Sequence, residues 1–374
     1  MRIERIELPA PSPGTSLQLR LLRFGTAGAR PKAYLQAGLH GGELPGMLVL
    51  AKLEELLLEA EADILGEIVI VPVASPIGTG QSVMGVTLGR FDLFEMTNFN
   101  RGWPDPFDEL AAAVEGRLGP DPVANVAAVR TAWRELAEAM PWHGTNGALR
   151  RALYGEAIDA DLVLDLHCDL EAVMHLYLGT PLWPSAADLA AELGAAATLL
   201  AEESGGEPFD EALSTPWWQL QRHFPDHPIP LACLAATIEL RGMRDVDEAL
   251  AEQDARALFR FLQRRGLIRG KPGALAPLSA EATPLTGVAM VRAPHAGLVS
   301  FRERPGAVVE AGQELATLID PLAPPGSRRS PILAPIAGLL FARTDNRLVR
   351  PGEIVLKIAG ATPLPERKGR LLDD

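Results

Sequence analysis

The sequence predicts an α/β protein with a mixed, twisted sheet flanked by helices, followed by a small all-β C-terminal domain. Two observations lead to this prediction. Apolar, strand-like runs alternate with amphipathic helical stretches as far as residue 266, and beyond it short apolar runs alternate with turn residues instead. The chain has 374 residues, which exceeds the usual size of one compact core, so two domains are expected.

The first domain is predicted to alternate strands with helices. Apolar or β-branched runs indicate strands at 32–39, 66–76, 160–169, 175–180 and 230–242. Helical periodicity or strong helix formers indicate helices at 43–60, 106–117, 122–140, 185–204 and 245–266. Parallel strands joined by helices bury the sheet on both faces, which is the arrangement expected here.

The domain boundaries follow from changes in composition. We place the first domain at residues 1–268 and a linker rich in Pro, Gly and Ala at 269–287. The β-rich domain is predicted at 288–362, with a tail at 363–374.

The C-terminal domain contains an internal repeat. Residues 292–301 match 333–342, and residues 308–319 match 348–359. These half-repeats resemble those of biotinyl- and lipoyl-type domains, which implies a barrel-sandwich fold. Such domains carry their cofactor on a lysine at a hairpin turn, whereas Lys357 and Lys368 are not at such a turn. We therefore interpret this domain as the scaffold without an attached cofactor.

The overall charge excludes several partners. A formal net charge of −13 repels phosphate backbones and anionic membrane surfaces, so neither nucleic acid nor a membrane is expected as a partner. The start lacks a secretory apolar segment, and no stretch of about eighteen apolar residues occurs. We expect a cytoplasmic protein that acts on a small-molecule carboxylate and can form a homo-oligomer. Its two cysteines, Cys168 and Cys233, offer no sulfur metal site, and a disulfide is disfavoured in a cytosolic chain.

The segment HGGE follows the first predicted strand directly. Open α/β sheets bind ligands at the carboxyl ends of their strands. Gly41 and Gly42 allow a tight backbone path, so the imidazole of His40 and the carboxylate of Glu43 can converge. These side chains form a partial ligand set for catalytic zinc, which takes three protein ligands. A surface histidine followed by a helix-capping glutamate remains the alternative.

A third ligand is predicted on the strand at 160–169. His167 lies near its carboxyl end, and Asp165 projects from the same face two residues earlier. Asp165 either orients the imidazole or supports the sheet. Cys168 points to the opposite face and is interpreted as a small buried apolar residue.

Glu239 is a lone acid near the end of an apolar strand. Burial of an unpaired carboxylate costs free energy, so the residue requires a compensating role. It could take a proton from metal-bound water. A salt bridge to Arg241 or Arg244 explains it equally well.

The segment NFNRGWPD contributes a possible carboxylate-binding group. Arg101 lies beside Asn100, with Arg90 upstream, and the planar guanidinium suits two-pronged binding of a carboxylate. Ordinary surface arginines are the alternative.

The order of these motifs resembles the succinylglutamate desuccinylase/aspartoacylase family of the zinc carboxypeptidase-like superfamily, over roughly residues 30–265. The resemblance implies that His40, Glu43 and His167 hold one zinc ion per chain and that Glu239 is the general base. It also implies that Asn100 and Arg101 bind the substrate carboxylate and that Arg90 polarises the scissile carbonyl. The sequence departs from the family's Asn-Pro at 74–76 and has no tyrosine late in the chain, which affects substrate identity.

The resulting functional prediction is a zinc-dependent amide hydrolase acting on an N-acyl amino acid or a similar small carboxylate. A zinc carboxypeptidase acting on short peptides is the closest alternative. A non-catalytic binding protein on the same fold is the alternative from another class.

Overall fold

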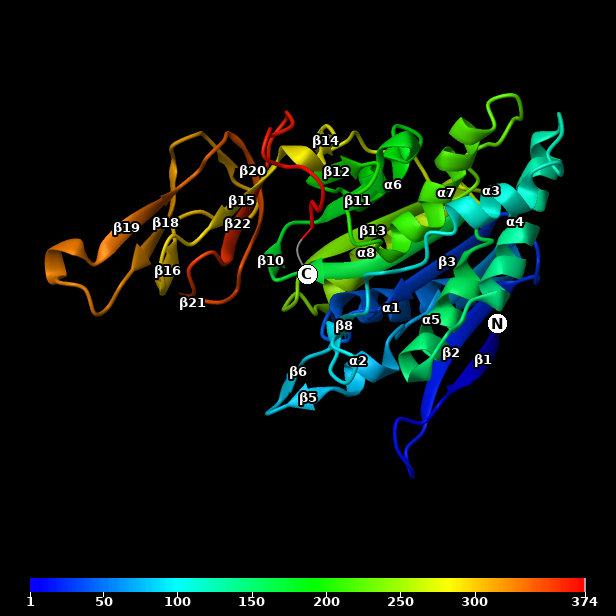
Figure 1. Cartoon of the computed structure of the whole chain (residues 1–374), viewed down its shortest axis with the longest axis horizontal. Helices are drawn as coiled ribbons and strands as arrows, with labels where there is room; N and C mark the ends of the chain where they lie inside the picture. The colour runs from blue at the N-terminus through cyan, green and yellow to red at the C-terminus, as the bar shows by residue number, and fades with distance from the viewer. Residues whose placement is uncertain (373–374) are drawn as a thin grey trace.

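A computed structural model describes residues 1–372, and its large mixed sheet flanked by helices confirms the α/β part of the predicted fold class (Figure 1). The last two residues of the predicted tail lie outside the described residues. The sheet has nine strands in the order β1 (Arg2–Leu8), β2 (Leu17–Gly25), β4 (Glu67–Val71), β3 (Lys32–Ala37), β9 (Leu162–Asp169), β13 (Leu234–Gly242), β11 (His175–Gly179), β12 (Ala197–Ala201) and β14 (Thr283–Pro284).

The centre of this sheet is parallel. Strands β4, β3, β9 and β13 run in one direction, and β11 runs antiparallel to β13. The carboxyl ends of β3, β9 and β13 therefore meet at one edge of the sheet, where α/β proteins bind ligands. This edge carries His167 on β9 and Glu239 on β13, and His40 follows β3 by three residues.

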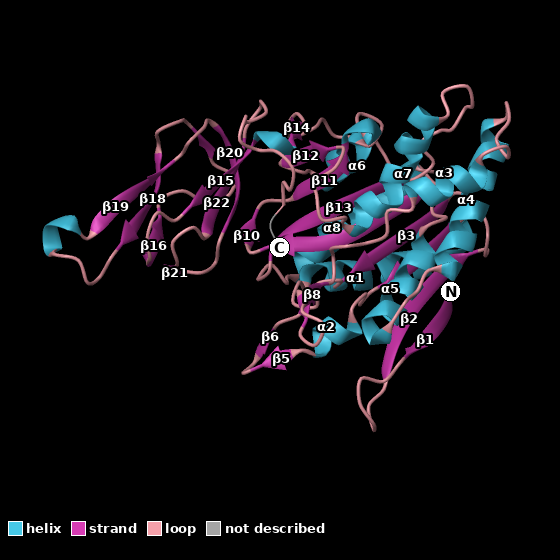
Figure 2. Ribbon diagram, in the orientation of Figure 1, coloured by secondary structure: helices cyan, strands magenta, loops and turns pink. Residues whose placement is uncertain are grey.

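Helices cover both faces of the sheet (Figure 2). One face buries an apolar cluster with Leu53 and Leu258, and the other buries a cluster with Trp133 and Trp217. Helices α1 (Pro45–Glu59), α6 (Ala187–Leu193) and α8 (Glu248–Arg264) supply the first cluster. Helices α3 (Phe107–Val114), α4 (Pro122–Ala139), α5 (Gly144–Ala157) and α7 (Phe209–His223) supply the second.

The helix expected at 185–204 is wrong over its second half. Helix α6 ends at Leu193 because Gly194 adopts a left-handed conformation, with φ of 64°. Residues Ala197–Ala201 then form β12, which pairs with β11 in the main sheet. Backbone pairing at the sheet and burial of Leu199 outweigh the helix propensity of the alanines. The sequence analysis also assigned no element to the hairpin β1–β2 or to α5 and α7.

The C-terminal region contains small antiparallel sheets, and the two halves of the sequence repeat form equivalent hairpins in them. The first repeat forms β16 (Gly297–Phe301) paired with β18 (Glu314–Ile319), and the second forms β20 (Gly338–Arg343) paired with β22 (Ile354–Ala359). The first hairpin joins β19 (Arg329–Leu333) and β21 (Leu348–Val349) in one sheet. The second joins β10 (Glu171–Ala172), β15 (Val288–Arg292) and β17 (Val308–Val309) in the other.

The C-terminal sheets are attached directly to the main sheet. Strand β10 follows β9 after one residue and pairs with β20. The ion pairs Glu171–Arg343 and Asp169–Lys357 cross the same boundary. Apolar side chains of β12, β20 and β22 share one buried cluster beside these pairs. The C-terminal region therefore lies against the carboxyl edge of the main sheet, close to His167.

Cys168 and Cys233 are both buried and free, so no disulfide joins these two residues of the described range 1–372. Trp217 and Trp218 are 0% and 2% exposed, which makes them packing residues of α7. None of the helices within residues 1–372 combines the length and apolarity needed to cross a bilayer.

Candidate active site

The loop after β3 is held against a neighbouring loop at Gly41. The backbone N–H of Gly41 donates to the carbonyl of Gly89 at 2.8 Å. A Cβ atom at position 41 would lie 2.3 Å from the backbone nitrogen of Thr79, so only glycine fits there. This close backbone contact turns His40 and Glu43 inward, where they are 3% and 6% exposed.

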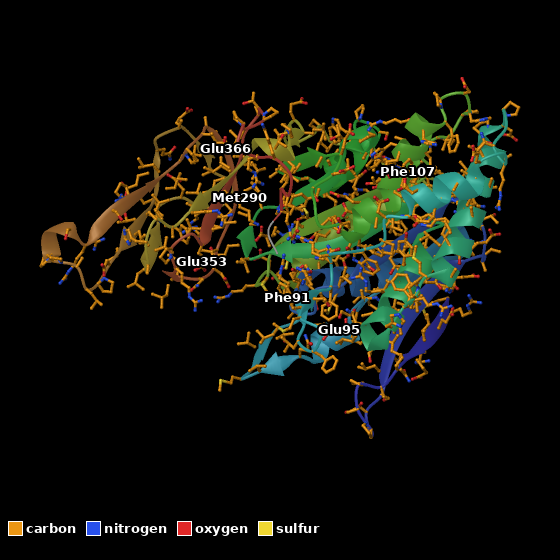
Figure 3. The ribbon with its side chains drawn as sticks, viewed as in Figure 1. Phe91, Glu95, Phe107, Met290, Glu353 and Glu366 are labelled. Carbon is orange, nitrogen blue, oxygen red and sulfur yellow. The ribbon has the colours of Figure 1, made fainter. Side chains whose placement is uncertain are left out.

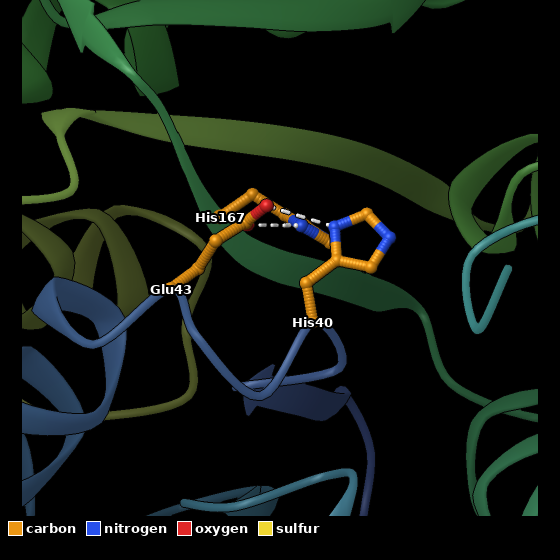
Figure 4. Close-up of side chains that lie close together, drawn as sticks. All are labelled: His40, Glu43 and His167. Carbon is orange, nitrogen blue, oxygen red and sulfur yellow. Dashed lines mark hydrogen bonds and ion pairs between the residues drawn. The ribbon is translucent and has the colours of Figure 1, made fainter. Parts of the chain in front are cut away.

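His40, Glu43 and His167 converge on one point (Figure 4). One candidate ligand atom from each lies within 4.8 Å of the others. The Glu43 carboxylate lies between the imidazoles: Oε1 is 2.9 Å from Nδ1 of His40 and Oε2 is 2.8 Å from Nδ1 of His167. The fold thus brings together three buried side chains of the types that bind zinc, two of them separated from the third by more than one hundred residues.

The outer nitrogens of both imidazoles contact oxygen atoms. Nε2 of His40 is 2.9 Å from Oδ1 of Asn98, and Nε2 of His167 is 2.9 Å from Oδ2 of Asp165. A neutral imidazole with its proton on Nε2 has Nδ1 free to bind a cation, whereas a protonated imidazole donates from Nδ1 to Glu43. Two imidazole nitrogens and a carboxylate oxygen, all within 4.8 Å of one another, are ligands that zinc accepts. The donor set therefore fits a divalent cation.

Charges within this cluster shift the protonation of its members. Burial raises the pKa of Glu43, but the charges and hydrogen bonds of His40 and His167 outweigh it and hold this pKa well below its ordinary value. Burial lowers the pKa of His167, yet Asp165 and Glu43 raise it well above the ordinary value. For His40 burial prevails and its pKa is lowered. Glu43 is consequently an anion that requires a neighbouring cation.

Glu239 lies beside the histidine cluster in the sheet. Its Cα is the register partner of His167 on β9 and of His175 on β11. Within residues 1–372, Oε2 of Glu239 is buried without a hydrogen-bond partner. Burial, with the charge of Glu43, raises the pKa of Glu239 to about 8. Arg241 pairs with Asp254 on α8 rather than with Glu239, which removes the alternative of a salt bridge to that arginine.

Arg90, Asn100 and Arg101 lie around the same cluster. The guanidinium of Arg90 is 3.2 Å from Oε1 of Glu43. The Asn100 amide nitrogen is 3.3 Å from Nε2 of His167, and its oxygen accepts from the backbone N–H of Phe209 at 2.8 Å. Arg101 donates to the carbonyl of Asn100 at 2.8 Å and lines the adjoining cavity. All three predicted residues are thus brought to the site, although the Asn100 side chain is also engaged in fixing its surroundings.

A cavity of about 670 Å³ adjoins the cluster. It is lined by His40, Glu43, His167, Glu239, Arg90 and Arg101, and also by residues that the sequence analysis did not associate with the site, namely Tyr177, Leu199, Met290, Arg343 and Lys357. The last three come from the C-terminal sheets (Figure 3 labels Met290). No local signal marked them, because their role depends on how the two parts of the chain pack.

Asn98 was also missed by the sequence analysis. It lies in the same NFNR segment as Asn100 and Arg101, and its oxygen contacts His40. Its place in this segment could have identified it, since a polar residue next to predicted site residues can reach the same site. Cys168 is 4% exposed and adds only its backbone N–H, which donates to Glu43 at 3.2 Å.

The chain matches a family model over residues 29–120, the Succinylglutamate desuccinylase/Aspartoacylase catalytic domain. This match contains His40, Glu43, Arg90, Asn100 and Arg101, and it confirms the family resemblance of the sequence motifs. No curated protein matches the chain.

Solved structures match over nearly the whole chain. A structure from Shewanella amazonensis SB2B named for the succinylglutamate desuccinylase/aspartoacylase family is 29% identical. It has a TM-score of 0.87, and the match covers 96% of this chain and 98% of that one. A similarly named structure from Shewanella frigidimarina NCIMB 400 is 27% identical, with a TM-score of 0.85 and 96% coverage of both chains.

A third structure shares the fold at lower identity. The ectoine utilization protein from Ruegeria pomeroyi, solved with bound product, is 19% identical with a TM-score of 0.68; the match covers 96% of this chain and 95% of that chain. At this identity the likeness concerns the fold alone. The similarity across all three structures extends to the C-terminal sheets, because the matches cover almost the full length.

Proposed function

We infer that this chain, which is similar to the succinylglutamate desuccinylase/aspartoacylase family in its motifs and its fold, is a zinc-dependent amide hydrolase. Its substrate is an N-acyl amino acid or a similar small carboxylate. The observation that carries the proposal is the buried His40–Glu43–His167 cluster beside Glu239, whose buried Oε2 has no hydrogen-bond partner among residues 1–372. A buried carboxylate between two imidazoles fits one zinc ion per chain, and the adjoining cavity provides room for a substrate.

When bound by His40, Glu43 and His167, zinc would supply Lewis acidity to a water molecule and to the substrate carbonyl. The remaining steps belong to side chains of this chain. Glu239 takes the proton of the attacking water and returns it to the leaving nitrogen, as a carboxylate whose buried Oε2 is not engaged by a hydrogen bond within residues 1–372 can do. Its position beside His167 in the sheet brings it to the same side of the cluster.

Arginines provide the positive charge that the substrate needs. Arg90 stabilises the oxyanion that forms at the scissile carbonyl, a role supported by its guanidinium lying 3.2 Å from Glu43. Arg101 lines the cavity and binds the substrate carboxylate, for which its planar guanidinium is suited. Asn100 holds Arg101 in place, since its carbonyl accepts from that guanidinium, and its side chain contacts His167.

The test is hydrolysis by the zinc-loaded protein of N-acyl amino acids and of dipeptides, measured side by side. We expect release of the amino acid from N-acyl substrates, loss of this activity after chelation and recovery on addition of zinc. Faster cleavage of dipeptides would instead identify a carboxypeptidase. Stoichiometric substrate binding without any turnover would identify a non-catalytic binding protein.

A further inference from the structure

We propose that the substrate carries an apolar group of several carbon atoms, which binds against a wall built jointly by the main sheet and the C-terminal region. The proposal rests on the hydrolase function inferred above and specifies its substrate class. The apolar group is either the acyl chain or the amino-acid side chain. A second carboxylate, of the kind found in succinyl or aspartyl groups, is disfavoured at this position.

Six apolar side chains line this part of the cavity and are called the apolar wall: Tyr177, Leu199, Ala201, Leu285, Met290 and Leu372. Tyr177 on β11 and Leu199 on β12 are register partners, so they project from the same face of the main sheet. Met290, which is labelled in Figure 3, comes from β15 in the C-terminal sheets. The same six residues belong to the apolar cluster between the two parts of the chain. The wall therefore exists only because these parts pack together.

The apolar wall begins next to the proposed base. Tyr177 is the register partner of Thr237 on β13, and Glu239 follows Thr237 by two residues on the same strand. Residues two apart on a strand project from the same face. A substrate whose scissile bond lies at Glu239 thus extends one of its ends toward Tyr177 and the wall.

The charges on this side of the cavity are already compensated. Nζ of Lys357 lies 2.5 Å from Asp169, and Nε of Arg343 lies 2.6 Å from Glu171. Apart from Arg90 and Arg101 these are the only lysine or arginine side chains lining the cavity in residues 1–372. Acidic side chains also line it, including Asp210 and Glu211. A second carboxylate would consequently contact acidic side chains and cations that already form ion pairs. An apolar group would contact apolar side chains.

The size of the cavity agrees with a larger substrate. About 670 Å³ holds on the order of twenty water molecules at their liquid volume, far more than an acetyl group displaces. Ligand pockets of this size are usually apolar with a few convergent polar groups. Each additional methylene buried against the wall strengthens binding roughly fourfold.

The experiment compares four substrates of the zinc-loaded, full-length protein: N-hexanoyl-glycine, N-acetyl-leucine, N-succinyl-glycine and N-acetyl-aspartate. We expect kcat/KM for at least one of the two apolar substrates to exceed that of both dicarboxylates at least tenfold. The faster of the two apolar substrates shows whether the acyl chain or the side chain faces the wall. A dicarboxylate that is cleaved fastest overturns the proposal.

Variants of the wall test the assignment of the site. Met290→Lys introduces an unpaired cation, and it should reduce the preference for the apolar substrate over the dicarboxylates at least tenfold. Leu372→Lys serves as the second variant in case the first fails to fold. Leu322→Lys is the matched control, because Leu322 is 93% exposed and remote from the cavity lining. An unchanged preference in a folded wall variant overturns the proposal.

Binding measurements separate this proposal from the hydrolase function. If no substrate is cleaved, the proposed function fails, and calorimetry with sodium hexanoate and sodium succinate still tests the wall. Tighter binding of hexanoate to the zinc-loaded protein, weakened by Met290→Lys, supports the apolar site. Equal or tighter binding of succinate contradicts it.

Discussion

The carboxylate of Asp165 lies 2.9 Å from Nε2 of His167, on the side of the ring away from Glu43. Both residues project from the same face of β9, two positions apart, and both are buried. The Asp165 carboxylate also accepts from the amide of Gln36 on β3 at 3.0 Å. Asp165 is therefore held by Gln36 while its charge lies beside the imidazole whose Nδ1 faces the proposed metal position.

Because Asp165 lies beside His167, the substitution Asp165→Asn is expected to weaken the affinity of the protein for zinc. The amide keeps the shape of the side chain but lacks the charge that favours the required form of the imidazole. Loss of such an orienting partner weakens metal binding about 10–100-fold. Competition with a chelator of known zinc affinity measures the change. Asp226→Asn, at an exposed position, is the control, and equal affinities for both variants would refute the orienting role.

Removal of a proposed ligand should abolish stoichiometric zinc binding. His167→Ala leaves one imidazole and Glu43, which is fewer than the three protein ligands of a catalytic zinc site. Metal analysis after extensive dialysis should give well below one equivalent. His143→Ala, which changes an exposed histidine, should keep the full equivalent. A full equivalent in His167→Ala would show that the cluster is not the metal site.

Glu239→Gln should separate catalysis from metal binding. The substitution removes the group that accepts the proton while keeping nearly the same volume. We expect kcat to fall about 10²–10⁴-fold with the zinc content unchanged. Turnover of an N-acyl amino acid and metal analysis on the same preparation provide the measurement. Near-normal kcat would exclude Glu239 as the base.

Arg101→Ala should act mainly on substrate binding. A lost charge-assisted hydrogen bond to a carboxylate costs about 1.5–3 kcal/mol, which raises KM about 10–100-fold. The zinc content should not change. Arg222→Ala removes an exposed arginine that pairs with Glu202 and is the matched control. An unaltered KM in Arg101→Ala would place the carboxylate elsewhere.

His175 should make the protein sensitive to acid. Burial lowers the pKa of His175 to about 4, and its Nδ1 donates to the carbonyl of Val173. The unfolded chain takes up this proton near pH 6.5, so between these values it binds more protons than the folded protein. The contribution to stability is complete above about pH 6.5 and is lost as the pH falls toward 4.

His175→Phe tests this dependence, because the ring is surrounded by Tyr177 and Phe341 and phenylalanine cannot be protonated. Urea unfolding at pH 7 and pH 4.5 should show the variant gaining about 1–3 kcal/mol relative to the parent at the lower pH. His143→Phe, at an exposed position, should show no such gain. A pH-independent difference between parent and His175→Phe would contradict the assignment.

Much of the fold followed from local patterns. The buried apolar runs of β4, β9 and β13 and the amphipathic repeat of α8 each identify an element without reference to the rest of the chain. The stretch at 185–204 did not follow in this way, because alanine-rich sequence favours a helix until a neighbouring strand offers backbone hydrogen bonds. Part of the site could also be predicted, because His40 and Glu43 closely follow a predicted strand.

The sequence by itself determined the types of elements, the internal repeat, and the side chains capable of metal chemistry. Only the tertiary structure decided that His167 meets Glu43, that Asn98 contacts His40, and that Lys357 pairs with Asp169. These contacts join segments far apart in the chain, so they depend on strand register and on the packing of two sheets. Local sequence determines the conformational preference of single turns and strands. Contacts between distant segments depend instead on which surfaces the whole chain buries together.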